Sequence, residues 1–128
     1  MNTTVAPAGG ISLHAVDVAR GVPAQGLLAE LWLLPPEADA GAAPRCIAAG
    51  PVGANGQLDH PCVRGEGIVA GLYEARFHVG AHLREAVGPQ ASPFLDVVPF
   101  RFRLTEVAQH VHLPFKFTPW GYSLFRGV

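Results

Sequence analysis

Glycine and proline divide this sequence into short segments, and that division limits the possible folds more than any other property. The chain has 15 Gly and 12 Pro among 128 residues, about a fifth of the total. Both residues favour turns, and proline interrupts helices. Between them lie stretches in which apolar and polar residues alternate, as in half-buried strands. The sequence therefore predicts a mainly β protein, a two-sheet β-sandwich, rather than a helical bundle.

The predicted strands follow from this alternation. The Asn55-Gly56 pair predicts a tight turn, because both residues tolerate positive φ. One helix is predicted over residues 81–87, where helix-forming residues precede Gly88 and Pro89. Residues 20–23 predict a turn. The predicted strands are 11–18, 27–34, 46–52, 72–79, 96–104 and 107–117, with a short last strand bracketed by Pro119, Gly121 and Gly127.

Length and charge limit the organisation and the partners. We expect one domain over residues 11–128, preceded by a flexible leader over residues 1–10. The leader has no Lys or Arg and no apolar core of a secretion signal, so a cytoplasmic protein is expected. The net charge of −1 predicts no nucleic-acid partner, and the apolar runs are too short for a membrane-spanning helix. Cys46 and Cys62 are expected to be reduced thiols.

Histidine supplies the main chemical signal. His110 and His112 are two apart in a predicted strand, so their side chains share one face. Such a pair suits proton transfer, a zinc site completed by His14, or simple packing, and the spacing leaves all three open. His60 and His82 are expected at the surface. His78 is expected on the polar face of its strand.

No common catalytic motif narrows these alternatives. The sequence has no nucleophile elbow, phosphate-binding loop, dinucleotide fingerprint or His-Glu-x-x-His helix. Residue chemistry alone indicates a histidine-bearing β-sandwich, with hydrolysis as one alternative.

Several segments, in order, resemble the transthyretin-related family, whose bacterial members are 5-hydroxyisourate hydrolases. The ending resembles the family's His-x-His and its final Tyr-Arg-Gly-Ser, and the opening resembles its Leu-Ser-Thr-His segment. The segments are His110-Val111-His112-Leu113-Pro114, residues 118–123, residues 125–128, residues 11–24, residues 71–74, residues 77–80 and residues 93–96.

The resemblance implies a transthyretin-like sandwich of two four-stranded sheets with one short helix. It also implies a homotetramer, a dimer of dimers, with active sites in a channel between the dimers, and a hydrolase that uses no metal or other cofactor. By position, the catalytic residues would be His14 and His112. The residues that would contact substrate are Gln57, His110, Tyr122, Phe125, Arg126, Gly127 and Val128.

Three departures from the family pattern affect the expected substrate. Gln57 stands where the family has Arg, Phe125 replaces Tyr, and Val128 replaces Ser. Each change makes the site less cationic or less polar. We therefore expect an N-methylated hydroxyisourate, such as would arise when caffeine or another methylxanthine is oxidised.

Two other functions remain open. The chain could be an ordinary hydroxyisourate hydrolase of urate breakdown, with Arg45, Arg64 or Arg126 replacing the missing arginine. It could also be a non-catalytic protein that binds a small ligand. Retention of both His14 and His112 favours the hydrolases, because a carrier needs neither.

Overall fold

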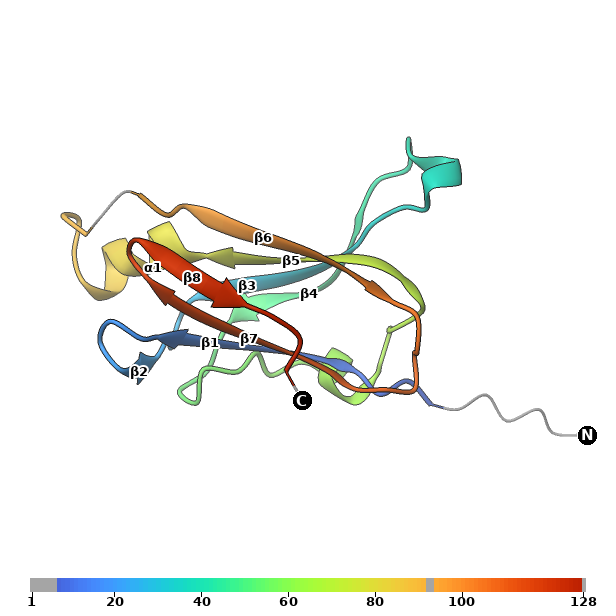
Figure 1. The fold of residues 1–128 in the computed structure, drawn as a ribbon, viewed down its shortest axis with the longest axis horizontal. Helices are drawn as coiled ribbons and strands as arrows, with labels where there is room; N and C mark the ends of the chain where they lie inside the picture. The colour runs from blue at the N-terminus through green and yellow to red at the C-terminus, as the bar shows by residue number, and fades with distance from the viewer. Residues whose placement is uncertain (1–6, 92–93, 128) are drawn as a thin grey trace, which may run out of the picture.

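Two four-stranded β-sheets pack face to face in the computed structural model, which describes residues 7–91 and 94–127 (Figure 1). The expected two-sheet sandwich is confirmed. Of the expected leader, residues 1–6 lie outside the described residues. The first sheet has the order β2 (Val22–Pro23), β1 (Ile11–Asp17), β7 (Val111–Thr118) and β8 (Gly121–Leu124). The second has the order β4 (Arg45–Pro51), β3 (Leu28–Leu33), β5 (Gly71–His78) and β6 (Val97–Leu104).

Strand alternation builds the core between the sheets. In β1, Leu13 and its neighbours two residues away are almost fully buried. The same period in β7 buries Phe115, whose ring centroid lies 4.4 Å from that of Phe77 on β5. Because successive side chains point to opposite faces, burial of this set directs Ser12 and His14 to the outer face of the first sheet.

β1 and β7 run parallel, whereas the other strand pairs are antiparallel. Their register places Ser12 opposite His112 and continues from Ile11 to Asp17. This pairing joins two parts of the chain that are 100 residues apart. It fixes which outward-facing side chains meet on the first sheet.

The helix α1 (Val79–Ala86) begins directly after β5 and corrects one expectation. His82 is only 6% exposed, whereas the sequence predicted a surface residue. It lies three residues after Val79 and shares the buried helix face, with its ring against the edge of Phe117 at 6.1 Å. Its Nε2 is buried without a hydrogen-bond partner among the described residues.

Two further boundaries differ from the sequence predictions. β7 begins at Val111 rather than at residue 107, because residues 106–109 form a turn closed by the Gln109 amide and the Glu106 carbonyl at 3.0 Å. Val22 and Pro23 form a short strand instead of a turn, paired with Asp17 and Val16. Short 3-10 helices form at Glu37–Asp39, within residues 35–44 that the sequence predicts as a loop, and at Pro61–Arg64.

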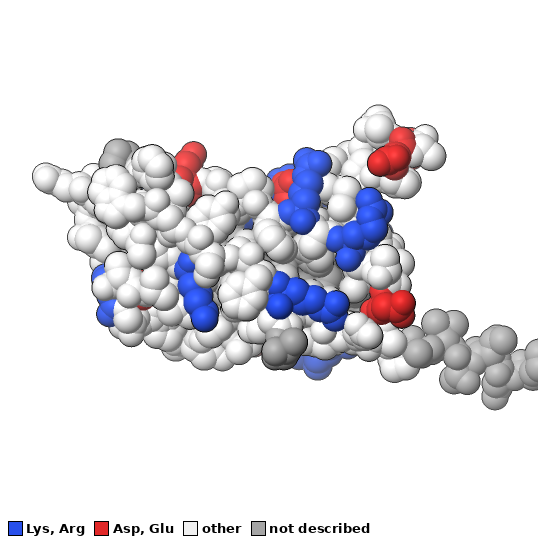
Figure 2. All heavy atoms as spheres, viewed as in Figure 1, with Lys and Arg blue, Asp and Glu red and all other residues white. Residues whose placement is uncertain are grey.

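Charged side chains are scattered over the face that carries β6 and β8, where Figure 2 shows Lys and Arg interrupted by uncharged surface. One of the ion pairs crosses from β5 to β6, where Arg101 donates to Glu74 at 2.7 Å. No helix within the described ranges is long and apolar enough to cross a bilayer.

Candidate active site

An open cavity of about 630 Å³ lies over the outer face of the first sheet. Its walls come from β1, β7, the segment after β4 and the C-terminal segment, which only the tertiary fold brings together. The residues that line it are Ser12, Gln57, Val63, His110, His112, Arg126 and Gly127. Five of the residues that the sequence selected therefore share one cavity.

The two proposed catalytic histidines are neighbours, although only His112 is among the residues that line the cavity. The ring centroids of His14 and His112 lie 6.0 Å apart and the rings are tilted by 32°. Nε2–H of His14 donates to the backbone carbonyl of Asn55 at 3.1 Å. A water or substrate atom held between the two rings would lie within reach of both.

Ser12 connects the histidines of β7, and the sequence reasoning missed it. Its Oγ lies 2.6 Å from Nδ1 of His112 and 2.9 Å from Nε2 of His110. Nδ1 of His110 in turn lies 2.7 Å from the carbonyl oxygen of Gly9. One signal was available, because Ser12 is two residues before His14 and must share its face of the strand.

The turn after β4 positions Gln57 next to His14. These two residues form an isolated antiparallel bridge, flanked by hydrogen bonds from the Ala15 amide to the Gly56 carbonyl at 2.8 Å and from the Leu58 amide to β1 at 3.1 Å. Gly56 has φ of 81°, and a Cβ there would lie 2.9 Å from Cδ2 of His14. The predicted Asn-Gly turn is thus packed directly against the histidine ring.

The C-terminal segment closes another side of the cavity. Gly127 forms an isolated bridge with His112, and its amide donates to the His112 carbonyl at 2.7 Å. A Cβ at Gly127 would lie 3.0 Å from Cδ2 of His112. The backbone of this segment therefore approaches the histidine as closely as glycine allows.

Two residues that the sequence assigned to the site, Tyr122 and Phe125, do not line the cavity. Tyr122 pairs with Phe117 and packs against Phe115 with ring centroids 5.8 Å apart, so it does not line the cavity. Phe125 is exposed, with Nζ of Lys116 5.8 Å from its ring centroid. Val128 lies outside the described residues.

Electrostatics favour a neutral His112. Burial, and then the neighbouring His14 and His110, lower the pKa of His112 below its usual 6.5. At neutral pH its ring is therefore unprotonated on one nitrogen and can accept a proton.

Arg126 supplies the positive charge among the described residues that line the cavity. Of the other two arginines that could replace the missing family residue, Arg64 lines an adjoining cavity of about 470 Å³ that shares Gln57 and Val63. Arg45 begins β4 and lines neither cavity.

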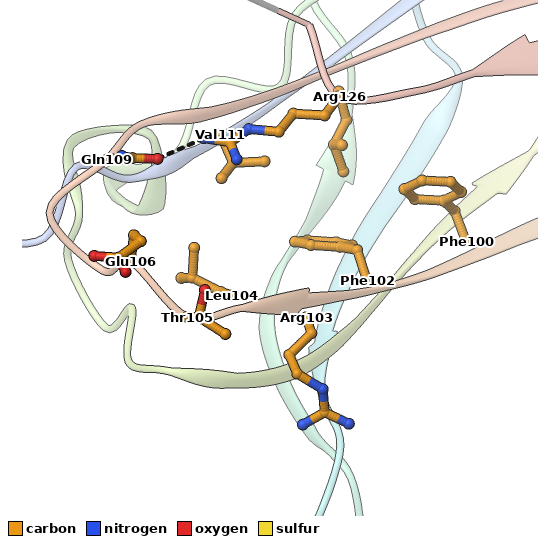
Figure 3. Close-up of a pocket in the computed structure, with 10 residues that line it drawn as sticks. Phe100, Phe102, Arg103, Leu104, Thr105, Glu106, Gln109, Val111 and Arg126 are labelled. Carbon is orange, nitrogen blue, oxygen red and sulfur yellow. Dashed lines mark hydrogen bonds between the residues drawn. The ribbon is translucent and has the colours of Figure 1, made fainter.

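Arg126 also borders a second, smaller cavity of about 110 Å³ at the open edge between the sheets (Figure 3). Its guanidinium donates to Oε1 of Gln109 at 3.0 Å, across the end of this cavity. Phe102 and Val111 supply part of its apolar wall. The hydrogen bond with Gln109 thus holds Arg126 between the two cavities.

The remaining histidines and the cysteines do not join the cavity. Nδ1 of His60 accepts a hydrogen bond from the Cys62 amide at 3.0 Å and caps a 3-10 helix. Burial raises the pKa of the Cys62 thiol to about 11, and Cys46 is exposed. Within the described ranges, no group of three or more His, Cys, Asp and Glu is arranged to hold a metal ion, which gives the zinc alternative no support.

Comparison with known sequences identifies the relatives of this chain. A sequence model described as the HIUase/Transthyretin family matches residues 11–127. The 5-hydroxyisourate hydrolase of Halalkalibacterium halodurans is 36% identical over 120 residues, covering 93% of this chain and 98% of that protein. The 5-hydroxyisourate hydrolase 2 of Rhizobium meliloti is 37% identical over 120 residues, covering 93% of this chain and 96% of that protein.

Solved structures share the fold. The 5-hydroxyisourate hydrolase of Klebsiella pneumoniae superposes with a TM-score of 0.71 at 25% identity, covering 92% of this chain and 97% of that chain. Sea bream transthyretin in complex with thyroxine superposes with a TM-score of 0.77 at 22% identity, covering 92% and 94%. The arrangement of the strands is therefore similar to that of a hydrolase and to that of a transthyretin in complex with thyroxine.

Proposed function

Because this chain belongs to the HIUase/transthyretin family, we propose that it is a hydrolase that opens the ring of a 5-hydroxyisourate-type substrate without a cofactor. The observation that carries the proposal is the pairing of the His14 ring with the ring of His112, which lines the cavity. The names of relatives at 36% and 37% identity support the same reaction.

The reaction needs a base that takes a proton from water, hydrogen-bond donors to the developing oxyanion, and a proton for the departing nitrogen. The site offers a group for each. Water adds to a cyclic acyl carbon while His112 accepts its proton. Arg126 and the Gln57 amide can donate to the oxygen that becomes negative. The ring C–N bond then breaks, and the departing nitrogen takes a proton from the histidine pair.

The preferred substrate in this proposal is N-methylated. Gln57 occupies the position next to His14 and carries no charge, whereas the family pattern has Arg there. Unmethylated hydroxyisourate has acidic N–H groups and can become an anion, which a cation would bind better. Methylation removes those protons, so a neutral Gln57 suits a methylated ring, as formed by oxidation of caffeine or another methylxanthine.

Assembly into a homotetramer, a dimer of dimers, is part of the same proposal. The cavity is open on the outer face of the first sheet, and large aromatic side chains at the adjacent edge are exposed, with Trp120 at 65% and Phe125 at 45%. Association of first sheets would cover this surface and enclose the substrate. Light scattering should give four times the 13.5 kDa chain mass, and a monomer that is fully active would contradict the assembly.

A stopped-flow comparison of two fresh substrates tests the reaction and the preference. Hydroxyisourate and its 1,3,7-trimethyl analogue would be generated from the corresponding urates, with spontaneous decay subtracted. We expect faster opening of the trimethyl ring, abolished in His14→Ala and His112→Ala.

Each other outcome selects one of the alternatives. Preference for the unmethylated ring would identify an ordinary hydroxyisourate hydrolase and remove the methylated substrate from the proposal. No acceleration of either ring, together with binding of an aromatic ligand, would identify a small-ligand-binding protein.

A further inference from the structure

We propose that Ser12 and His110 are positioning residues: with the Gly9 carbonyl they form a hydrogen-bond relay that keeps the proton of His112 on Nδ1 and leaves Nε2 free to accept the proton of water. This inference rests on the proposed hydrolase function and assigns the base within it.

The donor and acceptor roles along the relay follow from the Gly9 carbonyl at its fixed end. The Gly9 carbonyl can only accept, so Nδ1 of His110 must carry the hydrogen in their 2.7 Å contact. Neutral His110 then has an unprotonated Nε2, which accepts from the Ser12 hydroxyl at 2.9 Å. Having donated its one hydrogen, Ser12 can only accept from His112, so Nδ1 of His112 is protonated in their 2.6 Å contact.

Backbone packing holds that fixed end in place. The Gly9 amide donates to the Val107 carbonyl at 2.8 Å, and the Gly10 carbonyl accepts from the Val111 amide at 2.9 Å. A Cβ on Gly9 would lie 2.5 Å from the His110 amide nitrogen. These contacts require glycine and fix the carbonyl that His110 meets.

The free end of the relay faces the cavity. His112 lines it, and its Nε2 has no hydrogen-bond partner in residues 7–91 and 94–127. His14 has the opposite tautomer, because its Nε2–H donates to the Asn55 carbonyl. The two rings are therefore not interchangeable, and the relay assigns the role of base to His112.

Proton uptake strengthens the relay. When Nε2 of His112 accepts a proton from water, the ring becomes an imidazolium, and its Nδ1–H bond to Ser12 becomes charge-assisted. Ser12 thus orients the base before the reaction and stabilises its charged form afterwards.

Nitrogen-15 NMR of the histidine rings tests the relay directly, because it distinguishes Nδ1–H from Nε2–H. In the full-length protein above pH 7, we expect Nδ1–H for His110 and His112, and Nε2–H for His14. Ser12→Ala should move His112 towards Nε2–H, the form preferred in water, whereas Ser12→Thr keeps the hydroxyl and should keep Nδ1–H.

A second variant interrupts the relay at another point. His110→Phe removes the acceptor for the Ser12 hydroxyl, which can then donate to Nδ1 of His112. We expect His112 to convert to Nε2–H, a reversal that general loosening of the site would not produce. Finding Nε2–H on His112 in the unaltered protein, or Nδ1–H retained in both Ser12→Ala and His110→Phe, would overturn the relay.

Kinetic measurements would show how much the relay contributes to catalysis. Ser12→Ala should lower kcat about tenfold with a smaller change in KM, the effect of one lost orienting hydrogen bond. Thr105→Ala removes an exposed hydroxyl at the end of β6 and serves as the control. Because the NMR tautomers need no substrate, an inert protein with the expected tautomers would refute the hydrolase function and leave the relay intact.

Discussion

Gln57 and His14 face each other across an isolated antiparallel bridge, so the backbone fixes the position of Gln57 relative to the proposed catalytic pair. A substitution at position 57 therefore changes the chemistry next to His14 while the two backbone hydrogen bonds that flank the bridge remain. This makes the residue a direct test of charge in substrate choice.

Gln57→Arg should shift the preference towards the unmethylated ring. The added cation and forked donor should raise kcat/KM for hydroxyisourate about 10- to 100-fold, comparable with one oxyanion donor. The same change should leave kcat/KM for the trimethyl ring unchanged or lower. Gln25→Arg adds the same charge at an exposed position outside the cavity and should change neither value. Equal changes for both substrates would refute a charge-based preference.

Gly56→Ala should damage both stability and activity. Its left-handed φ of 81° makes a side chain cost about 1–2 kcal/mol, and the new Cβ would lie 2.7 Å from the Ala15 carbonyl oxygen and 2.9 Å from Cδ2 of His14. Gly21→Ala is the matched control, because Gly21 has φ of 69° but nothing within 4 Å of its Cβ position. Urea unfolding should show losses for both variants, whereas only Gly56→Ala should reduce kcat/KM, by about tenfold or more. Full activity in Gly56→Ala would show that His14 does not need this contact.

The pH profile should report a base with a lowered pKa. Burial and the neighbouring histidines hold the pKa of His112 below 6.5, and the base works only when unprotonated. We therefore expect kcat/KM to be level around neutral pH and to fall as the pH drops through a value below 6.5. Initial rates from pH 5 to 8 would measure it, and a midpoint above 6.5 would contradict this assignment.

His82→Leu should stabilise the fold, most of all in mild acid. Burial, followed by the charge of Arg20, lowers the pKa of His82, so the unfolded chain binds a proton near pH 6.5 that the folded chain resists. Folding stability should therefore fall as the pH drops through 6.5. The substitution removes both this proton linkage and the unpartnered Nε2, for a gain of about 1 kcal/mol at pH 8 and more at pH 5.5. Urea unfolding at both pH values would test it, and a loss of stability at pH 5.5 would count against the explanation.

The sequence predicted much of the fold because the alternation of apolar and polar residues along a strand reflects which side chains are buried. The strands around Leu13 and Phe77 follow from period-two patterns, and the helix follows from helix-forming residues closed by Gly88-Pro89. His82 was predicted wrongly, because its place on the buried helix face depends on how α1 packs against Phe117. The start of β7 was also wrong, because a local hydrogen bond at Gln109 interrupts an apparently continuous segment.

The site was predictable as a set of histidines but not as a network. His14 and His112 could be paired from the family pattern, and the structure brings them together. The role of Ser12 depends on the parallel register of β1 and β7, which no local pattern encodes. Contact of the Gly9 carbonyl with His110 likewise needs the path of the chain before β1.

The parallel pairing of β1 with β7 has a consequence for folding kinetics. Ser12 and His112 are separated by 100 residues, so their contact requires closure of nearly the whole chain. Contacts of such long range form slowly, whereas the antiparallel β3–β4 and β5–β6 pairs connect nearer segments. During refolding, sheet formation measured by circular dichroism should precede the recovery of ring-opening activity. The rate at which activity returns would then report when β1 pairs with β7.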